Sequence, residues 1–143
     1  GFGVLAVILV LAIGEPQPGI TPVTPVPTGP TLPTSVDPQG LVRIVAALVN
    51  SVKSPEVEVV TLLNASPREV SLQGWALADS QKNRQKLTGS LKAGEARAIK
   101  VEKPVALSNK GGIISVLDET GLKVDGVSYT KAQASNPGWT IVF

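Results

Sequence analysis

Residues that could perform chemistry are few in this chain of 143 residues. It contains no histidine and no cysteine, so it lacks the commonest general base, any thiolate nucleophile and the commonest transition-metal ligands. A Ser-His-Asp triad and a histidine-based zinc site are therefore excluded. We expect a binding or structural protein rather than an enzyme, and we expect no cofactor.

The remaining candidates are one acidic group and one serine–lysine pair. Asp118, Glu119 and Asp125 lie close together in the sequence, but their spacing does not match a calcium-binding loop. We expect them to be turn acids in solvent. Ser108 and Lys110 lie on a predicted turn, where a buried lysine base cannot be set against a nucleophile. The sequence therefore predicts no catalytic, cofactor-binding or metal site.

The large aromatic residues favour packing over chemistry. Trp75 is the natural core residue of a β-sandwich, and Gly74 before it allows close backbone packing or a bulge. Tyr129 is expected to be a buried ring whose hydroxyl has a partner. For Trp139, which follows a Pro-Gly turn, a core position is favoured, and a place in an interface near a sheet edge is the alternative.

The charge distribution is modest and scattered. Thirteen basic and eleven acidic residues give a net charge of +2, too small to indicate nucleic acid. The densest basic group is Lys82, Arg84 and Lys86, which we interpret as part of a solvated strand or turn. No nucleic-acid partner is expected.

Residues 41–143 have the pattern of a β domain. Short β-branched or apolar runs occur at 41–50, 57–64, 69–79, 84–91, 95–102, 112–121, 122–129 and 138–143, with turn residues between them. This spacing predicts an all-β sandwich. The run 113–117 is apolar on both faces, which favours a central strand. Gly121 is expected to take a positive φ in a hairpin turn over 118–121.

Residues 15–40 form a proline- and threonine-rich linker. Eight of the twelve prolines fall in this segment. Each proline fixes φ, removes an N–H group and restrains the residue before it to extended geometry. The segment is therefore expected to be an extended spacer, either a plain linker or a surface stalk able to carry O-linked sugar.

Residues 1–14 are a hydrophobic segment. The run from 4 to 13 is uncharged and apolar, yet shorter than the roughly 20 residues of a membrane-spanning helix. Its periodicity does not distinguish helix from strand. Because no face of it is polar, we expect burial in a membrane, in another subunit or in copies of itself. The predicted assembly residues are Phe2, Val4, Leu5, Val7, Ile8, Leu9, Val10, Leu11 and Ile13.

Residues 41–143 resemble the lamin tail domain family. The matching strings are VEVVTLLNASPREVSLQGWALAD (57–79), LKAGEARAI (91–99) and LSNKGGIISVLDETGLKVDGVSY (107–129), in the family's order. The resemblance implies an immunoglobulin-like β-sandwich that serves as a non-catalytic interaction module. The absence of heptads argues against a nuclear filament rod, so the bacterial or archaeal secreted type is expected.

The hydrophobic segment partly resembles the head of type IV pilin-like subunits, although Leu5 stands where that family usually carries an acid. A segment inserted into the next subunit makes a head-to-tail contact that propagates into a filament. We therefore predict an extracellular, cell-surface filament subunit whose main partner is itself. The alternatives are a membrane-tethered module that binds a surface protein or glycan, and the C-terminal domain of a larger secreted enzyme.

Overall fold

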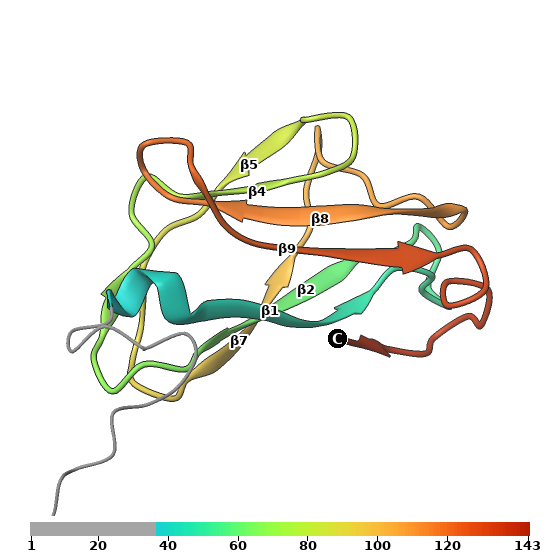
Figure 1. The fold of residues 1–143 in the computed structure, drawn as a ribbon. Coiled ribbons are helices and arrows are strands. Elements are labelled where there is room, and N and C mark those ends of the chain that lie inside the picture. The colour runs from blue at the N-terminus through green and yellow to red at the C-terminus, as the bar shows by residue number, and fades with distance from the viewer. Residues whose placement is uncertain (1–36) are drawn as a thin grey trace, which may run out of the picture. The chain divides into compact units, whose positions relative to one another are not determined.

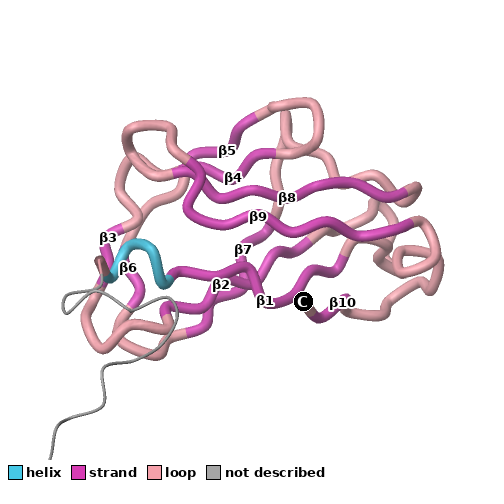
Figure 2. Tube along the Cα trace, viewed as in Figure 1, coloured by secondary structure: helices cyan, strands magenta, loops and turns pink. Residues whose placement is uncertain are grey.

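Ten strands and a short 3₁₀ helix make up residues 37–143, the part of the chain that the computed structural model describes (Figures 1 and 2). Each run expected to be extended contains at least one strand, so the predicted all-β class is confirmed. The elements are η2 (Pro38–Leu41), β1 (Val42–Leu48), β2 (Val59–Asn64), β3 (Val70–Ser71), β4 (Ala76–Ala78), β5 (Arg84–Lys86), β6 (Ser90–Leu91), β7 (Ala96–Lys100), β8 (Gly111–Leu117), β9 (Lys123–Thr130) and β10 (Ile141–Val142).

The strands form two four-stranded sheets and one small ribbon. The strand orders are β10-β1-β2-β7 and β5-β4-β8-β9, and β3 pairs with β6. Every pairing is antiparallel. Figure 1 shows the sheet that contains β8 above the sheet that contains β1. The apolar sides of the two layers can therefore bury each other.

The core contains side chains from both sheets. Trp75 is 1% exposed, which confirms the core position predicted for it. Leu62 on β2 and Ile114 on β8 are equally buried, one from each layer. Fully burying an apolar side chain of this size stabilises a fold by about 1.5–3 kcal/mol. The other most deeply buried large apolar side chains are Leu72, Leu77, Leu91, Val42, Val49, Val60 and Val116.

Strand β8 is central, because it lies between β4 and β9. The apolar pattern also predicts burial on both faces, and this holds only in part. Ile114 and Val116 are buried, and so is Leu117 at the end of the strand, but Ile113 on the other face is 50% exposed. The reason is that the second layer covers one side of the sheet, and a strand presents alternate residues to opposite sides.

Two glycines divide runs that look continuous in the sequence. Gly74 and Gly89 have φ values of 81° and 80°, which side chains other than glycine rarely adopt. The run 69–79 therefore becomes β3 and β4, and the run 84–91 becomes β5 and β6. At Gly74 a Cβ atom would also lie 3.0 Å from Cβ of Glu119, so the predicted close packing there is confirmed.

Strand β1 changes neighbours along its length. The register between β1 and β2 shifts between Ile44 and Ala46, which marks a β-bulge. Before the bulge, the backbone N–H of Ile44 donates to the side chain of Asp125 on β9. Beyond it, Ala46 and Ala47 pair with β10. The shift thus falls where β1 passes from its contact with β9 to its pairing with β10.

The segment before β1 differs from the extended geometry expected up to residue 40, because Pro38–Leu41 forms a 3₁₀ helix. The rest of the expected linker and all of the predicted assembly segment, residues 1–14, lie outside the described residues.

Candidate interaction surface

Asp118 organises the turn between β8 and β9. Its Oδ1 accepts hydrogen bonds from the backbone N–H groups of Thr120 at 2.8 Å and Leu122 at 3.0 Å, and from the Thr120 hydroxyl at 2.6 Å. The Thr120 hydroxyl is the main reason that the pKa of Asp118 lies below its ordinary value. Gly121 has a φ of 85°, as predicted for this hairpin turn. Asp118 therefore stabilises the turn between β8 and β9.

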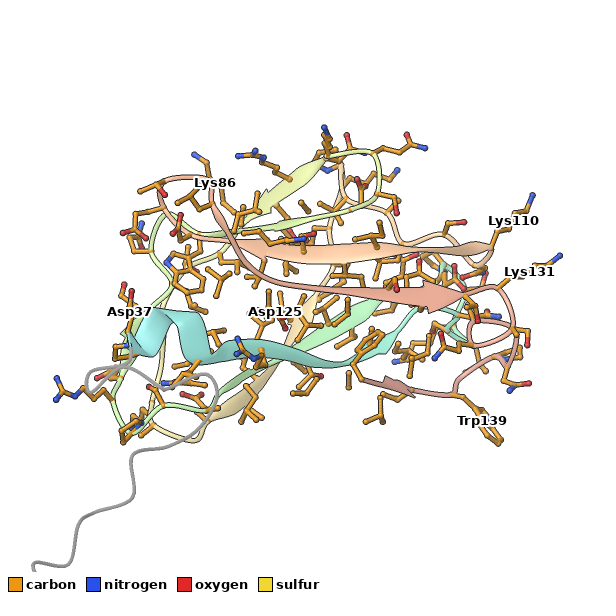
Figure 3. The ribbon with its side chains drawn as sticks, viewed as in Figure 1. Asp37, Lys86, Lys110, Asp125, Lys131 and Trp139 are labelled. Carbon is orange, nitrogen blue, oxygen red and sulfur yellow. The ribbon has the colours of Figure 1, made fainter. Side chains whose placement is uncertain are left out.

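The expectation that Asp118, Glu119 and Asp125 are all turn residues in solvent is wrong for Asp125. It lies on β9 and is half-buried, and its Oδ2 accepts the Ile44 backbone N–H at 2.8 Å. This bond joins the two sheets, and Figure 3 places Asp125 between β9 and β1. Within residues 37–143 no three acidic side chains are grouped closely enough to hold a metal ion.

The Ser108–Lys110 segment is an exposed turn. The Ser108 hydroxyl accepts the backbone N–H of Lys110 at 3.0 Å, and Figure 3 shows the Lys110 side chain extending away from the fold. The carbonyl of Ser108 accepts the Tyr129 hydroxyl at 2.7 Å. Tyr129 is 4% exposed, so the prediction of a buried ring with a bonded hydroxyl is confirmed.

A hollow of about 380 Å³ lies beside this turn, lined partly by Asp79, Ser80 and Ser108. Burial acts to raise the pKa of Asp79, but hydrogen bonds from Asn83, Ala106 and Gln81 outweigh it and hold the pKa below its ordinary value. Both carboxylate oxygens are occupied by these donors, at 2.9–3.1 Å. The carboxylate therefore fixes a loop and has little capacity left for a substrate.

Glu58 and Tyr129 have pKa values displaced in the same direction. Burial raises the pKa of Glu58 against the opposing hydrogen bond from the Leu107 N–H, whose nitrogen lies 2.9 Å from Oε1. Burial, reinforced by the negative charges of Glu58 and Asp79, raises the pKa of Tyr129 to about 12. The phenol thus stays neutral and bonded to Ser108 at ordinary pH.

The side chain of Asn64 is the centre of a buried hydrogen-bond network that the sequence did not predict. The Asn64 amide donates to the carbonyls of Arg68, Leu91 and Lys92, and its Oδ1 accepts from the backbone and hydroxyl of Ser66. This saturates the amide and ties β2 to two loops. The Asn-Ala-Ser-Pro sequence is a turn signal that points to local bonding, but the distant carbonyls have no signal in the sequence.

Large apolar side chains are exposed beside β10. Trp139 is 70% exposed and Val142 76%, so the favoured core position for Trp139 is wrong. Figure 3 shows Trp139 projecting away from the fold. Val52 is 74% exposed and lies against Gly138, where a Cβ atom would approach its Cγ1 to 3.0 Å. Phe143 is 37% exposed, so the exposed apolar residues near β10 are Val52, Trp139, Val142 and Phe143.

The opposite edge of the same sheet is β7, and it borders a groove of about 380 Å³ that β5 lines on its other side. Gln85 on β5 crosses this groove. Its Nε2 donates to the Lys100 carbonyl at 2.9 Å and its Oε1 accepts the Glu102 N–H at 2.7 Å. The side-chain amide thus satisfies edge groups of the backbone as a neighbouring strand would.

The basic group predicted to be solvated is confirmed, since Lys82, Arg84 and Lys86 are all exposed along the β4–β5 hairpin. Arg97 on β7 donates to the Ser90 carbonyl and forms an ion pair with Glu95 at 3.1 Å. The edges of β5 and β7 therefore carry charged side chains, whereas the edge of β10 carries apolar ones.

The comparisons with known proteins give no further identification. No protein-family model matches the chain, and no curated protein matches its sequence. The lamin tail resemblance stays a prediction. Between residues 37 and 143 there is no helix long and apolar enough to cross a membrane. The predicted assembly residues 1–14 fall outside the described part of the chain.

Proposed function

We propose that this protein is a non-enzymatic subunit of an extracellular, cell-surface filament, in which residues 1–14 are buried in neighbouring subunits. Residues 15–36 would space the β domain from the filament axis. The domain itself is proposed to be an immunoglobulin-like sandwich of the lamin tail type. The two facing antiparallel sheets and the buried Trp75 support this assignment.

One observation carries the proposal: the β domain fills its core with its own side chains while the chain also carries an uncharged apolar segment. Core residues come from strands and loops between Val42 and Ile141. Trp75, Leu62 and Ile114 are already excluded from water by these neighbours. Residues 4–13 are therefore not needed to complete this core, and burial in another copy would remove them from water.

The chemistry of the domain supports an interaction role over catalysis. The Asp79 carboxylate and the Tyr129 hydroxyl are bonded to groups of the fold. The exposed apolar side chains beside β10 are instead available for contact with another molecule. Such a module suits a coat or lateral contacts along a filament.

The test compares the full-length chain with the double variant Val7→Asp and Leu9→Asp. Two charges in the hydrophobic segment should abolish assembly, because each buried carboxylate would lack a partner. The same change at two linker valines, Val23→Asp and Val26→Asp, is the matched control and should still assemble. Sedimentation and negative-stain electron microscopy provide the readout.

The same measurements distinguish the alternatives. Fibres formed by the unmodified chain and the linker control, but not by the head variant, support the filament. Monomers that stay in solution only with detergent would indicate a membrane-tethered module instead. A chain that is monomeric and soluble without detergent would refute the proposed function.

A further inference from the structure

We infer that the β10 edge is the acceptor for residues 4–13 of a second copy, which would add beside β10 as an extra strand. This inference rests on the filament function proposed above and names the surface that would receive the hydrophobic segment. It follows from three features of the described domain: unpaired backbone groups, exposed apolar side chains and the absence of charged side chains on that edge.

The backbone of β10 has an open side. Phe143 donates its N–H to the Val45 carbonyl at 3.0 Å, and Val142 lies opposite Ala46. Because hydrogen-bonded and non-bonded pairs alternate in an antiparallel ladder, Val142 directs its N–H and C=O away from β1. No residue in 37–143 bonds these two groups. A strand laid alongside would satisfy them.

The side chains around this open edge match an apolar strand. Trp139 and Val142 are exposed at 70% and 76%, and Val52 beside Gly138 is 74% exposed. The run Val4–Ile13 is apolar and uncharged throughout, and its ten residues fall within the usual length of a strand. Contact between the two would remove both apolar surfaces from water.

The other sheet edges fit this segment less well. On β7, Gln85 bonds to the backbone at Lys100 and Glu102, and Arg97 and Lys100 add charge. On β5, Arg84 and Lys86 are exposed. On β9, Asp125 bonds to β1 of the facing sheet. An uncharged strand offers no counter-ion to the cationic edges, which leaves β10 as its best match.

A second copy is the expected donor because of the linker. Residues 15–36 contain seven prolines, and such a sequence extends by about 3.1 Å per residue, or roughly 70 Å in all. A seven-residue strand such as β1 is only about 23 Å long. A semi-rigid spacer of this length would hold the segment away from its own edge and within reach of a neighbour. Repetition of that contact builds a filament.

The decisive experiment uses mixtures of two full-length chains with one cysteine each, since the natural chain has none. Ile8→Cys labels the donor and Thr140→Cys labels the loop entering β10. After oxidation of the assembled mixture, a disulfide-linked pair of the two different chains is expected. The control acceptor is Leu122→Cys. The Leu122 side chain is 68% exposed and precedes β9, whereas Thr140 comes after β9 and immediately before β10, so the control lies at the other end of β9 from the proposed acceptor.

A second measurement uses substitutions on the acceptor surface. Trp139→Ser combined with Val142→Lys should raise the critical concentration for assembly at least about tenfold, which corresponds to about 1.4 kcal/mol. Leu122→Lys, at an equally exposed apolar residue, should leave it unchanged. A denaturation curve for each variant establishes that the domain still folds.

The outcomes separate the inference from the function on which it rests. Cross-linking at Thr140 but not Leu122, together with the raised critical concentration, supports the β10 acceptor. Filaments that form normally, with no preference for Thr140 and no effect of the double substitution, overturn the acceptor and leave the filament standing. Failure of the unmodified chain to assemble refutes both.

Discussion

The two edges of the sheet β10-β1-β2-β7 differ in the side chains that flank their outer backbone groups. Both end in strands whose outer backbone groups face away from the sheet. At β7, the Gln85 amide bonds to two of those groups, and charged side chains flank the rest. At β10, the exposed residues include Trp139 and Val142, and no side chain between positions 139 and 143 is charged.

The difference shows that edge protection in this domain is selective. Charged residues and side-chain caps prevent a sheet edge from pairing with another chain. The β7 edge carries both devices and the β10 edge relies only on being two residues long. An edge left apolar beside an exposed tryptophan is suited to a contact, which is why we propose it as the assembly edge.

Loosening β10 should lower the stability of the domain more than a change at the β7 edge. Ile141 is 7% exposed and anchors β10 to the core, whereas Val142 next to it points outward. Ile141→Ala should lower the free energy of unfolding by about 2–5 kcal/mol, because it leaves a cavity. Val142→Ala should change it by less than about 0.5 kcal/mol. Denaturant unfolding of both variants measures this, and equal losses would contradict an outward-facing Val142.

A smaller effect is expected at the protected edge. Gln85→Ala removes both bonds to the β7 side and should lower the free energy of unfolding by about 0.5–1.5 kcal/mol. Gln85→Glu should recover only part of this, since a carboxylate accepts from Glu102 but cannot donate to Lys100. The control is Gln73→Ala, an exposed glutamine whose side chain makes no bond to residues 37–143. A loss no larger than in that control would remove Gln85 as an edge cap.

Substitutions at either edge should have no effect on the titration of Tyr129, which lies in the interior of the domain. Tyr129 is the only tyrosine, so tyrosinate absorbance reports it alone. Its pKa is raised from 10.0 to about 12, so its contribution to stability is full below pH 10 and is lost as the pH rises toward 12. Native chains carrying Gln85→Ala or Val142→Ala should give the same titration. A midpoint near 10 in the native protein would contradict the burial of the phenol.

Much of the fold was predictable because the relevant signals are local. Alternation and turn residues located the strands, and the Asp118–Gly121 turn follows from a side chain bonding its own backbone within four residues. The candidate surface was predictable only in part. Trp139 was favoured as a core residue because tryptophan is usually well buried, and nothing nearby in the sequence shows that β10 ends at a free edge.

Local signals were enough to predict the all-β class, the buried Trp75 and the positive φ at Gly121, because these depend on local periodicity, residue size and backbone sterics. Long-range packing is needed to explain why Asp125 bonds to Ile44, 81 residues away, and why Gln85 caps β7 while β10 stays open. Those outcomes depend on which strands become neighbours. Pairing is settled by how the two layers bury their apolar faces together, and no short stretch of residues contains that information.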